Sequence, residues 1–214
     1  MKVDEKLNVN MNCEVTGKSG KYLEVATIAI DKKGNEYQTI HIVAPAKGMK
    51  PKVGEYMHVE GTLDVDDNGI NVIEPLNWSM LEDKPKDQRM NAWLTGEATS
   101  NFIEPKSIED VASDKKPFGV ATIKVGNRFQ RGIVFNQLIP VFRKNLKAGA
   151  IFKMAGRLQY RTFVDKDDNE RTVCEVICDN NYTQILKAST KKNPFAFSSE
   201  DVMSGFKKAE EVSV

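Results

Sequence analysis

The chain has 214 residues, 40% of them hydrophobic and 29% charged, and a formal net charge of +1. This balance fits one large or two small globular domains with real cores and excludes an intrinsically disordered chain. The sequence has no apolar run long enough to span a bilayer and no signal-peptide pattern at its start, so we expect a cytoplasmic protein with no membrane contact. The three cysteines lack the spacing of a zinc site, and we expect them to be reduced and buried or half-buried.

The first half of the chain reads as short strands. Residues 22–30 and 37–44 flank a polar turn, and residues 56–65 lead through Asp67, Asn68 and Gly69 into residues 70–74. An Asn-Gly step between apolar runs is a strong hairpin signal. Residues 81–88 are polar and include Pro85, as expected of a linker.

The second half follows the same plan with additions. Residues 107–114 favour a short helix within an extra stretch at 101–116, residues 137–146 favour another short helix, and the last hairpin turns at 165–169. Three motifs of the first half recur here in order: MNCEVTG at 11–17 as MNAWLTG at 90–96, VATIAI at 25–30 as VATIKV at 120–125, and VGEYMHVEGTL at 53–63 as AGAIFKMAGRL at 148–158. Such a duplication indicates two folding modules.

We therefore place domains at 8–80 and 89–187, followed by a flexible C-terminal tail at 188–214. Five strands in a meander of this length predict an all-β chain of two tandem closed barrels, with short helices between strands. The charge is divided unevenly, since residues 8–80 carry a net charge of −3 and residues 89–187 a net charge of +5. We expect the basic half to bind a polyanion, because neutralising phosphates supplies most sequence-independent affinity for nucleic acids.

Residues 151–176 carry the clearest functional pattern. Successive side chains of a strand point to opposite faces, and here one face receives Lys153, Arg157, Arg161 and Phe163 while the other receives mostly apolar residues that can cover a core. A ring among cations is typical of a surface that binds single-stranded nucleic acid, where cations pair with phosphates and bases stack on the ring. The alternative interpretation is an edge hairpin whose charges only keep it soluble.

The corresponding strand of the first unit has Glu60 and Asp64 and no arginine. These acidic groups would repel phosphates unless Lys32, Lys33 and Tyr37 in the neighbouring hairpin compensate. We therefore expect the second barrel to provide most of the affinity, and the first to extend the path of the ligand or to hold the assembly together.

These motifs resemble bacterial-type single-stranded-DNA-binding proteins, whose fold is the oligonucleotide/oligosaccharide-binding (OB) barrel, a five-stranded Greek key. The likeness covers roughly residues 90–186, about half of the chain, and includes the opening NAWLTG, the strands FGVATI and FQRGIVF, and AGRLQYRTFV. The resemblance implies non-sequence-specific binding of single-stranded DNA in replication, recombination or repair. Because the family often assembles four barrels, it also implies a homodimer of two-barrel chains.

The resemblance also assigns roles to residues. The family's stacking aromatics correspond to Phe129, Phe135 and Phe163, and its phosphate-contacting arginines to Arg131 and Arg161. The predicted nucleic-acid-binding set is completed by Trp93, Lys124, Arg128, Lys153 and Arg157 of the second unit and by Tyr37, Lys32 and Lys33 of the first. The turn at 126–128 departs from the family, which usually has a longer loop there with another aromatic residue.

The tail departs from the family too, since it ends in SSEDVMSGFKKAEEVSV and lacks an acidic patch with an apolar tip. Ser199 can cap a helix with Val202, Met203 and Phe206 on one side, which would form a docking helix for replication proteins. The alternative interpretation is a frayed terminus.

No constellation in the sequence predicts catalysis, a cofactor or a bound metal. The only candidate histidine bases are His41 and His58, both in expected strands,. GKS at 17–19 imitates the end of a phosphate-binding loop, but position 12 is Asn where that motif needs Gly,. The aspartates at 64–67 and 165–168 lie at hairpin ends, where solvated turns are expected rather than metal sites.

Two other functions without catalysis are consistent with the sequence. Single-stranded RNA is an alternative ligand, because OB barrels and aromatic platforms also accept RNA. The other alternative is a replication or primosome scaffold with weak nucleic-acid binding.

Overall fold

The computed structural model describes residues 3–30, 34–104, 118–126, 128–135, 137–164 and 168–189. In these ranges the chain forms eleven strands and one helix, α1 (Leu138–Asn145), which confirms the predicted all-β fold. The strands are β1 (Leu7–Ser19), β2 (Tyr22–Ile30), β3 (Glu36–Val43), β4 (Tyr56–Val65), β5 (Asn71–Leu81), β6 (Asn91–Glu97), β7 (Phe118–Val125), β8 (Arg128–Phe135), β9 (Ile151–Val164), β10 (Glu170–Cys178) and β11 (Gln184–Lys187). Outside the described residues lie the predicted helix at 107–114 and the candidate residues Lys32, Lys33, Val202, Met203 and Phe206.

The first five strands pair into a closed ring. β1 pairs with β2 and β4, β2 pairs with β3, β4 pairs with β5, and a short parallel pairing of β3 with β5 closes the ring. β1 reaches both neighbours because it is 13 residues long and its register shifts between Val15 and Gly17,. Its alternate residues Leu7, Val9 and Met11 are buried, so one face of the strand supplies the core of the ring.

The next five strands repeat this order. β9 pairs with β6 and β10, β7 pairs with β8, and β8 runs parallel to β10. An isolated bridge between Ala98 and Ile123 links β6 to β7 and closes the second ring. α1 covers the core of this ring, because Phe142 is fully buried with its ring centroid 5.7 Å from that of Phe152.

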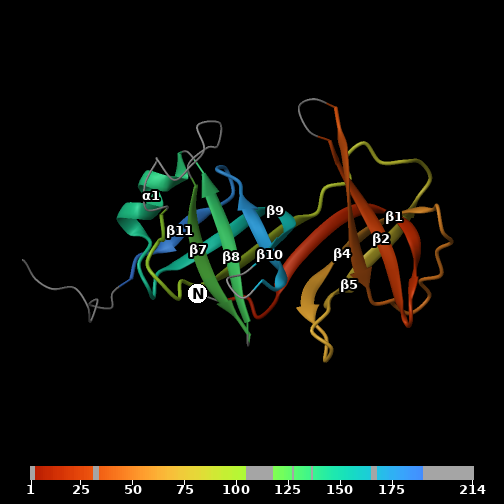
Figure 1. Ribbon diagram of the computed structural model, residues 1–214, viewed down its shortest axis with the longest axis horizontal. Helices are drawn as coiled ribbons and strands as arrows, with labels where there is room; N and C mark the ends of the chain where they lie inside the picture. Colours follow the sequence, from red (N-terminus) through yellow and green to blue (C-terminus); the bar gives the residue numbers. More distant parts are fainter. Residues whose placement is uncertain are drawn as a thin grey trace, which may run out of the picture.

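One sheet runs through both rings, because β1 also pairs with β6, from Asn8 opposite Trp93 to Asn10 opposite Asn91. The two strand groups therefore lie side by side (Figure 1). The domain boundaries at 8–80 and 89–187 stay a prediction, because the sheet is continuous from one group to the other.

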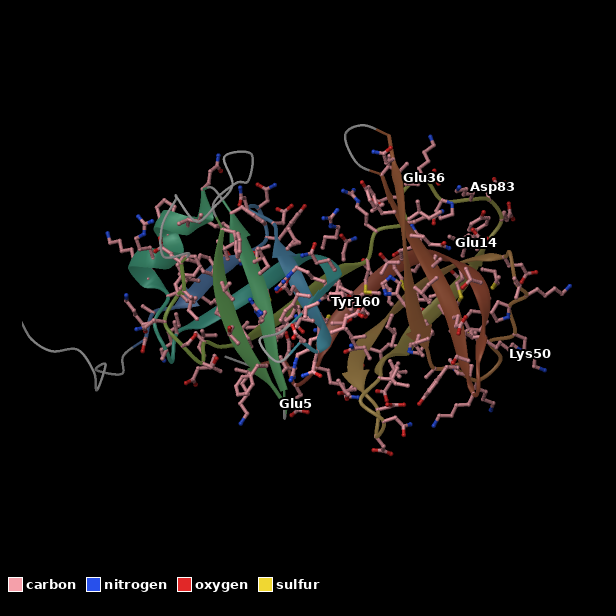
Figure 2. All side chains as sticks on the ribbon, viewed as in Figure 1. Glu5, Glu14, Glu36, Lys50, Asp83 and Tyr160 are labelled. Atoms are coloured by element: carbon pink, nitrogen blue, oxygen red, sulfur yellow. The ribbon has the colours of Figure 1, made fainter. Side chains whose placement is uncertain are left out.

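Tyr160 of β9 lies where the two groups meet (Figure 2), and its ring centroid is 5.7 Å from that of His41 in β3. His41 is buried, and burial lowers its pKa to about 4,. His41 therefore stays neutral at pH 7 and belongs to the packing between the groups.

Two glycines at equivalent positions of the repeat make the same contact. A Cβ atom on Gly61 in β4 would overlap the carbonyl oxygen of Glu74 in β5, and one on Gly156 in β9 would overlap that of Ile177 in β10. Only glycine allows a neighbouring backbone to approach this closely. The sequence match of 53–63 with 148–158 thus reflects one local geometry used twice.

Most predicted elements are confirmed. β2 and β4 have the predicted bounds, and α1 occupies the segment predicted as helical at 137–146. β5 is longer than the predicted 70–74, because it continues along β4 past a register shift at Glu60 and Gly61. The cysteines are free, with Cys13 and Cys178 buried and Cys174 half-buried, as predicted. In the described part of the chain, no helix has the length and apolarity needed to span a membrane.

Candidate nucleic-acid interface

The register of β7 and β8 places predicted residues on one face of the sheet. In β8 the side chains of Phe129, Arg131 and Phe135 share a side because they are spaced by even numbers of residues,. β7 aligns Lys124 with Phe129 and Phe118 with Phe135. This side points away from the core, since the intervening residues of β8 are buried.

β10 and β9 extend the same face. Glu175 in β10 is opposite Arg131 in β8 and opposite Gln159 in β9. Arg161 and Phe163 follow on the same side of β9,. We call the outward side of β7, β8, β10 and β9, which are neighbours in the sheet (Figure 1), the outer face.

A groove of about 480 Å³ hollows the outer face. Its floor includes the buried side chains of Ile133 and Glu175. We call it the outer groove, and its lining residues are Phe118, Arg131, Ile133, Phe135, Arg157, Gln159, Arg161, Glu175 and Ile177.

The aromatic rings of the outer face differ in accessibility. Phe129 is 64% exposed and Phe118 39% exposed, whereas Phe135 and Phe163 are half-buried. The ring centroids of Phe118 and Phe135 are 6.1 Å apart, and the Arg161 guanidinium lies 5.0 Å from the centroid of Phe163. Phe129 is therefore the most open ring of the four, while Phe163 already has a cation on one face.

A buried carboxylate binds the two arginines that the resemblance singled out. Arg161 donates from Nε and Nη2 to the two carboxylate oxygens of Glu175, both at 3.2 Å. Arg131 Nη2 lies 3.6 Å from Glu175 Oε1, and Gln159 Nε2 donates to Oε2 at 3.4 Å. The hydrogen bond with Glu175 raises the pKa of Arg161. Arg131 and Arg161 therefore share one negative charge and are not free cations.

The side chains of three other cationic residues in this region have no ion pair or hydrogen bond with any described residue. These are Lys124 at the edge of the outer face, Arg157 in the outer groove, and Lys153 further along β9. No internal ion pair has to break before one of them contacts a phosphate. They are accordingly the best-placed cations for that contact.

Arg157 lies where the outer groove meets two further hollows. One of these lies between the strand groups and is lined by Tyr37 of β3 as well as by residues of β9. The other is lined by Trp93 and Lys153. Arg157 lines all three, so the hollows adjoin one another at this residue, and the hollow between the strand groups also includes residues of the first unit.

The structure brings most of the predicted set together. The outer face carries Lys124, Phe129, Arg131, Phe135, Arg157, Arg161 and Phe163. Trp93, Lys153 and Tyr37 lie in the two adjoining hollows. Arg128 is opposite Val125 in the β7–β8 hairpin, and its side chain lies outside the described residues.

Sequence reasoning missed Phe118, Glu175 and Tyr182. Pairing residues 118–125 with 128–135 as a hairpin would have set Phe118 opposite Phe135. The position of Glu175 became clear only from the pairing of β10 with β8, which the sequence does not show. Tyr182 is 64% exposed, lines the same hollow as Trp93 and lies in a turn, where the sequence has no periodic signal.

Comparison with solved structures gives matches over nearly the whole chain. The wild-type single-stranded DNA binding protein from Thermus aquaticus matches with a TM-score of 0.58 and 15% sequence identity, over 91% of this chain and 97% of that chain. A deletion mutant of the same protein matches with a TM-score of 0.55 and 15% identity, over 88% and 97%. The chain shares the fold of a single-stranded DNA-binding protein.

This likeness confirms the fold that the motifs at 90–186 predicted. Because the match with the Thermus protein covers 91% of this chain, it includes both strand groups and not only the second. No protein-family model and no curated protein matches the sequence.

Proposed function

We propose that this protein binds single-stranded DNA without sequence preference, with the outer face as its main contact surface. The observation that carries the proposal is the gathering of an exposed ring, Phe129, and the unpaired cations Lys124 and Arg157 on one face of the sheet. The fold shared with the Thermus protein, which is named as a single-stranded DNA binding protein, supports it.

The chemistry of this face suits an unpaired strand. Every base has a flat surface that can stack on a phenylalanine, so stacking favours no base in particular. Lys124, Lys153 and Arg157 offer charges to the phosphates between the stacked bases. The bases of a duplex remain stacked on each other and would not reach Phe129, so duplex DNA is a poorer ligand.

The proposed path of the strand leaves the outer groove at Arg157. From there the hollow between the strand groups leads towards Tyr37, which is 56% exposed on β3. The first unit then extends the path and does not supply the main site. In its β4 the acidic Glu60 remains at the surface, with its carboxylate 3.4 Å from His58 Nε2.

The same proposal includes the role of the protein in DNA replication, recombination or repair, and its assembly as a homodimer. It also includes the docking of replication proteins on the tail residues Val202, Met203 and Phe206. The cellular role and the homodimer rest on the resemblance, whereas the docking rests on the helix that the sequence pattern at 199–206 predicts.

Parallel titrations of the full-length protein with oligo-dT and a matched oligo-rU over a salt series test the proposal. For single strands the logarithm of the binding constant falls by about 0.7 per contacted phosphate for each unit of log salt concentration. The three unpaired cations therefore contribute about −2 to the predicted slope when they contact phosphates, by that estimate of about 0.7 each. Tighter binding of RNA than of DNA would move the function to RNA, and binding that ignores salt would favour the protein scaffold.

A further inference from the structure

One carboxylate lies among the cations of the outer face. The Glu175 side chain is 1% exposed, and its bonding partners Arg131, Gln159 and Arg161 all belong to the outer groove. Burying a carboxylate is costly unless it is paired and hydrogen-bonded. Glu175 is therefore stable in this position only while the arginines lie over it.

The same contacts restrain the arginines. Arg161 binds Glu175 at two points, which fixes the plane of its guanidinium group. The Arg161 side chain is still 45% exposed and that of Arg131 38% exposed. A phosphate that reaches either arginine must share it with Glu175.

We infer that Glu175 is a positioning residue of this surface, which orients Arg131 and Arg161 and competes with the phosphates of the bound strand for them. This inference rests on the proposed function. The three side chains together present one net positive charge to the strand, whereas Arg157 presents a full charge of its own. Glu175 thereby weakens the binding and reduces its dependence on salt.

The test is the E175Q variant, because glutamine keeps the shape of the side chain and removes its charge. The salt slope for oligo-dT should steepen by about 0.7, the share of one phosphate contact on a single strand. At low salt the affinity should rise by up to about five-fold, the upper end of the range for solvent-exposed ion pairs. R131Q should flatten the slope by the same amount, and R131Q/E175Q should restore the wild-type slope because it removes one charge of each sign.

E170Q is the matched control. Glu170 is exposed on the same strand, β10, but is an odd number of residues from Glu175 and so lies on the other side of the sheet,. E170Q removes the same charge from the chain as E175Q and should leave the salt slope unchanged. If E175Q does not fold, the comparison of R131Q/E175Q with R131Q measures the same step.

Thermal unfolding of each variant separates stability from binding. If Glu175 only stabilises the fold, E175Q will lower the unfolding temperature, and the salt slope of the folded variant will stay at the wild-type value. That result would overturn the inference and leave the proposed function intact. A wild-type protein that binds no oligonucleotide would overturn both.

Discussion

Phe129 is the most exposed of the four phenylalanine rings on the outer face. Its spacing from Arg131 and Phe135 sets all three on one side of a strand, and the structure leaves its ring 64% exposed beside Lys124. Alternation within a strand is local, so the sequence predicts it well. Partners across strands are not local, which is why the bonds of Glu175 to Arg131 and Arg161 were not foreseen.

Truncating this ring gives a prediction at the scale of the residue. Phe129→Ala should weaken oligo-dT binding by about 1 to 3 kcal/mol, the usual contribution of one stacked base. The unfolding temperature should change little, because an exposed ring buries little surface in the free protein. Fluorescence anisotropy titrations at one salt concentration measure the loss.

Leu76→Ala is the control for that measurement. Leu76 is 77% exposed on β5, outside the outer face, and its truncation should leave binding unchanged. Equal affinity of Phe129→Ala and the wild-type protein would remove stacking on this ring from the account.

At the scale of the element, the predictable strands are those with a regular pattern. β4 alternates between buried and more accessible residues over nearly its whole length, and in β2 the alternate residues Leu23, Val25 and Thr27 are buried. The bounds of both strands were predicted from sequence. The continuation of β5 to Leu81 was not, because its register shift next to Gly61 breaks the alternation,. The extent of β1 was not predicted either, and its length lets it pair with three neighbouring strands.

The repeated glycines give a prediction at this scale. Gly61→Ala and Gly156→Ala should each lower the free energy of unfolding by about 1 to 3 kcal/mol or more, because the added methyl group overlaps the backbone of the next strand,. Urea unfolding followed by circular dichroism measures the change.

Gly17→Ala is the matched control, since the closest contact of a Cβ there would be with the flexible end of the Glu24 side chain and not with backbone. It should cost clearly less than either of the other two. Wild-type stability of Gly61→Ala and Gly156→Ala would contradict the close strand contact that the repeat is inferred to encode.

At the scale of the whole molecule, the repeat predicted two similar strand groups but not how they join. The pairing of β1 with β6 is made by strand edges, which carry no sequence signal,. This junction decides the shape of the candidate site, because it brings Tyr37 of the first group and Arg157 of the second to one hollow. The fold was thus predictable in outline, whereas the course of the surface across both groups required the structure.

Photo-cross-linking shows directly whether the bound strand lies on the outer face. Full-length protein is irradiated with oligo-dT carrying a photoreactive base, digested and analysed by mass spectrometry. We expect cross-links at Phe129 and Phe163, with further ones at Trp93 or Tyr37 as the oligonucleotide is lengthened. Cross-links confined to the β4–β5 hairpin or to residues 190–214, with none on β8 or β9, would contradict this position of the strand.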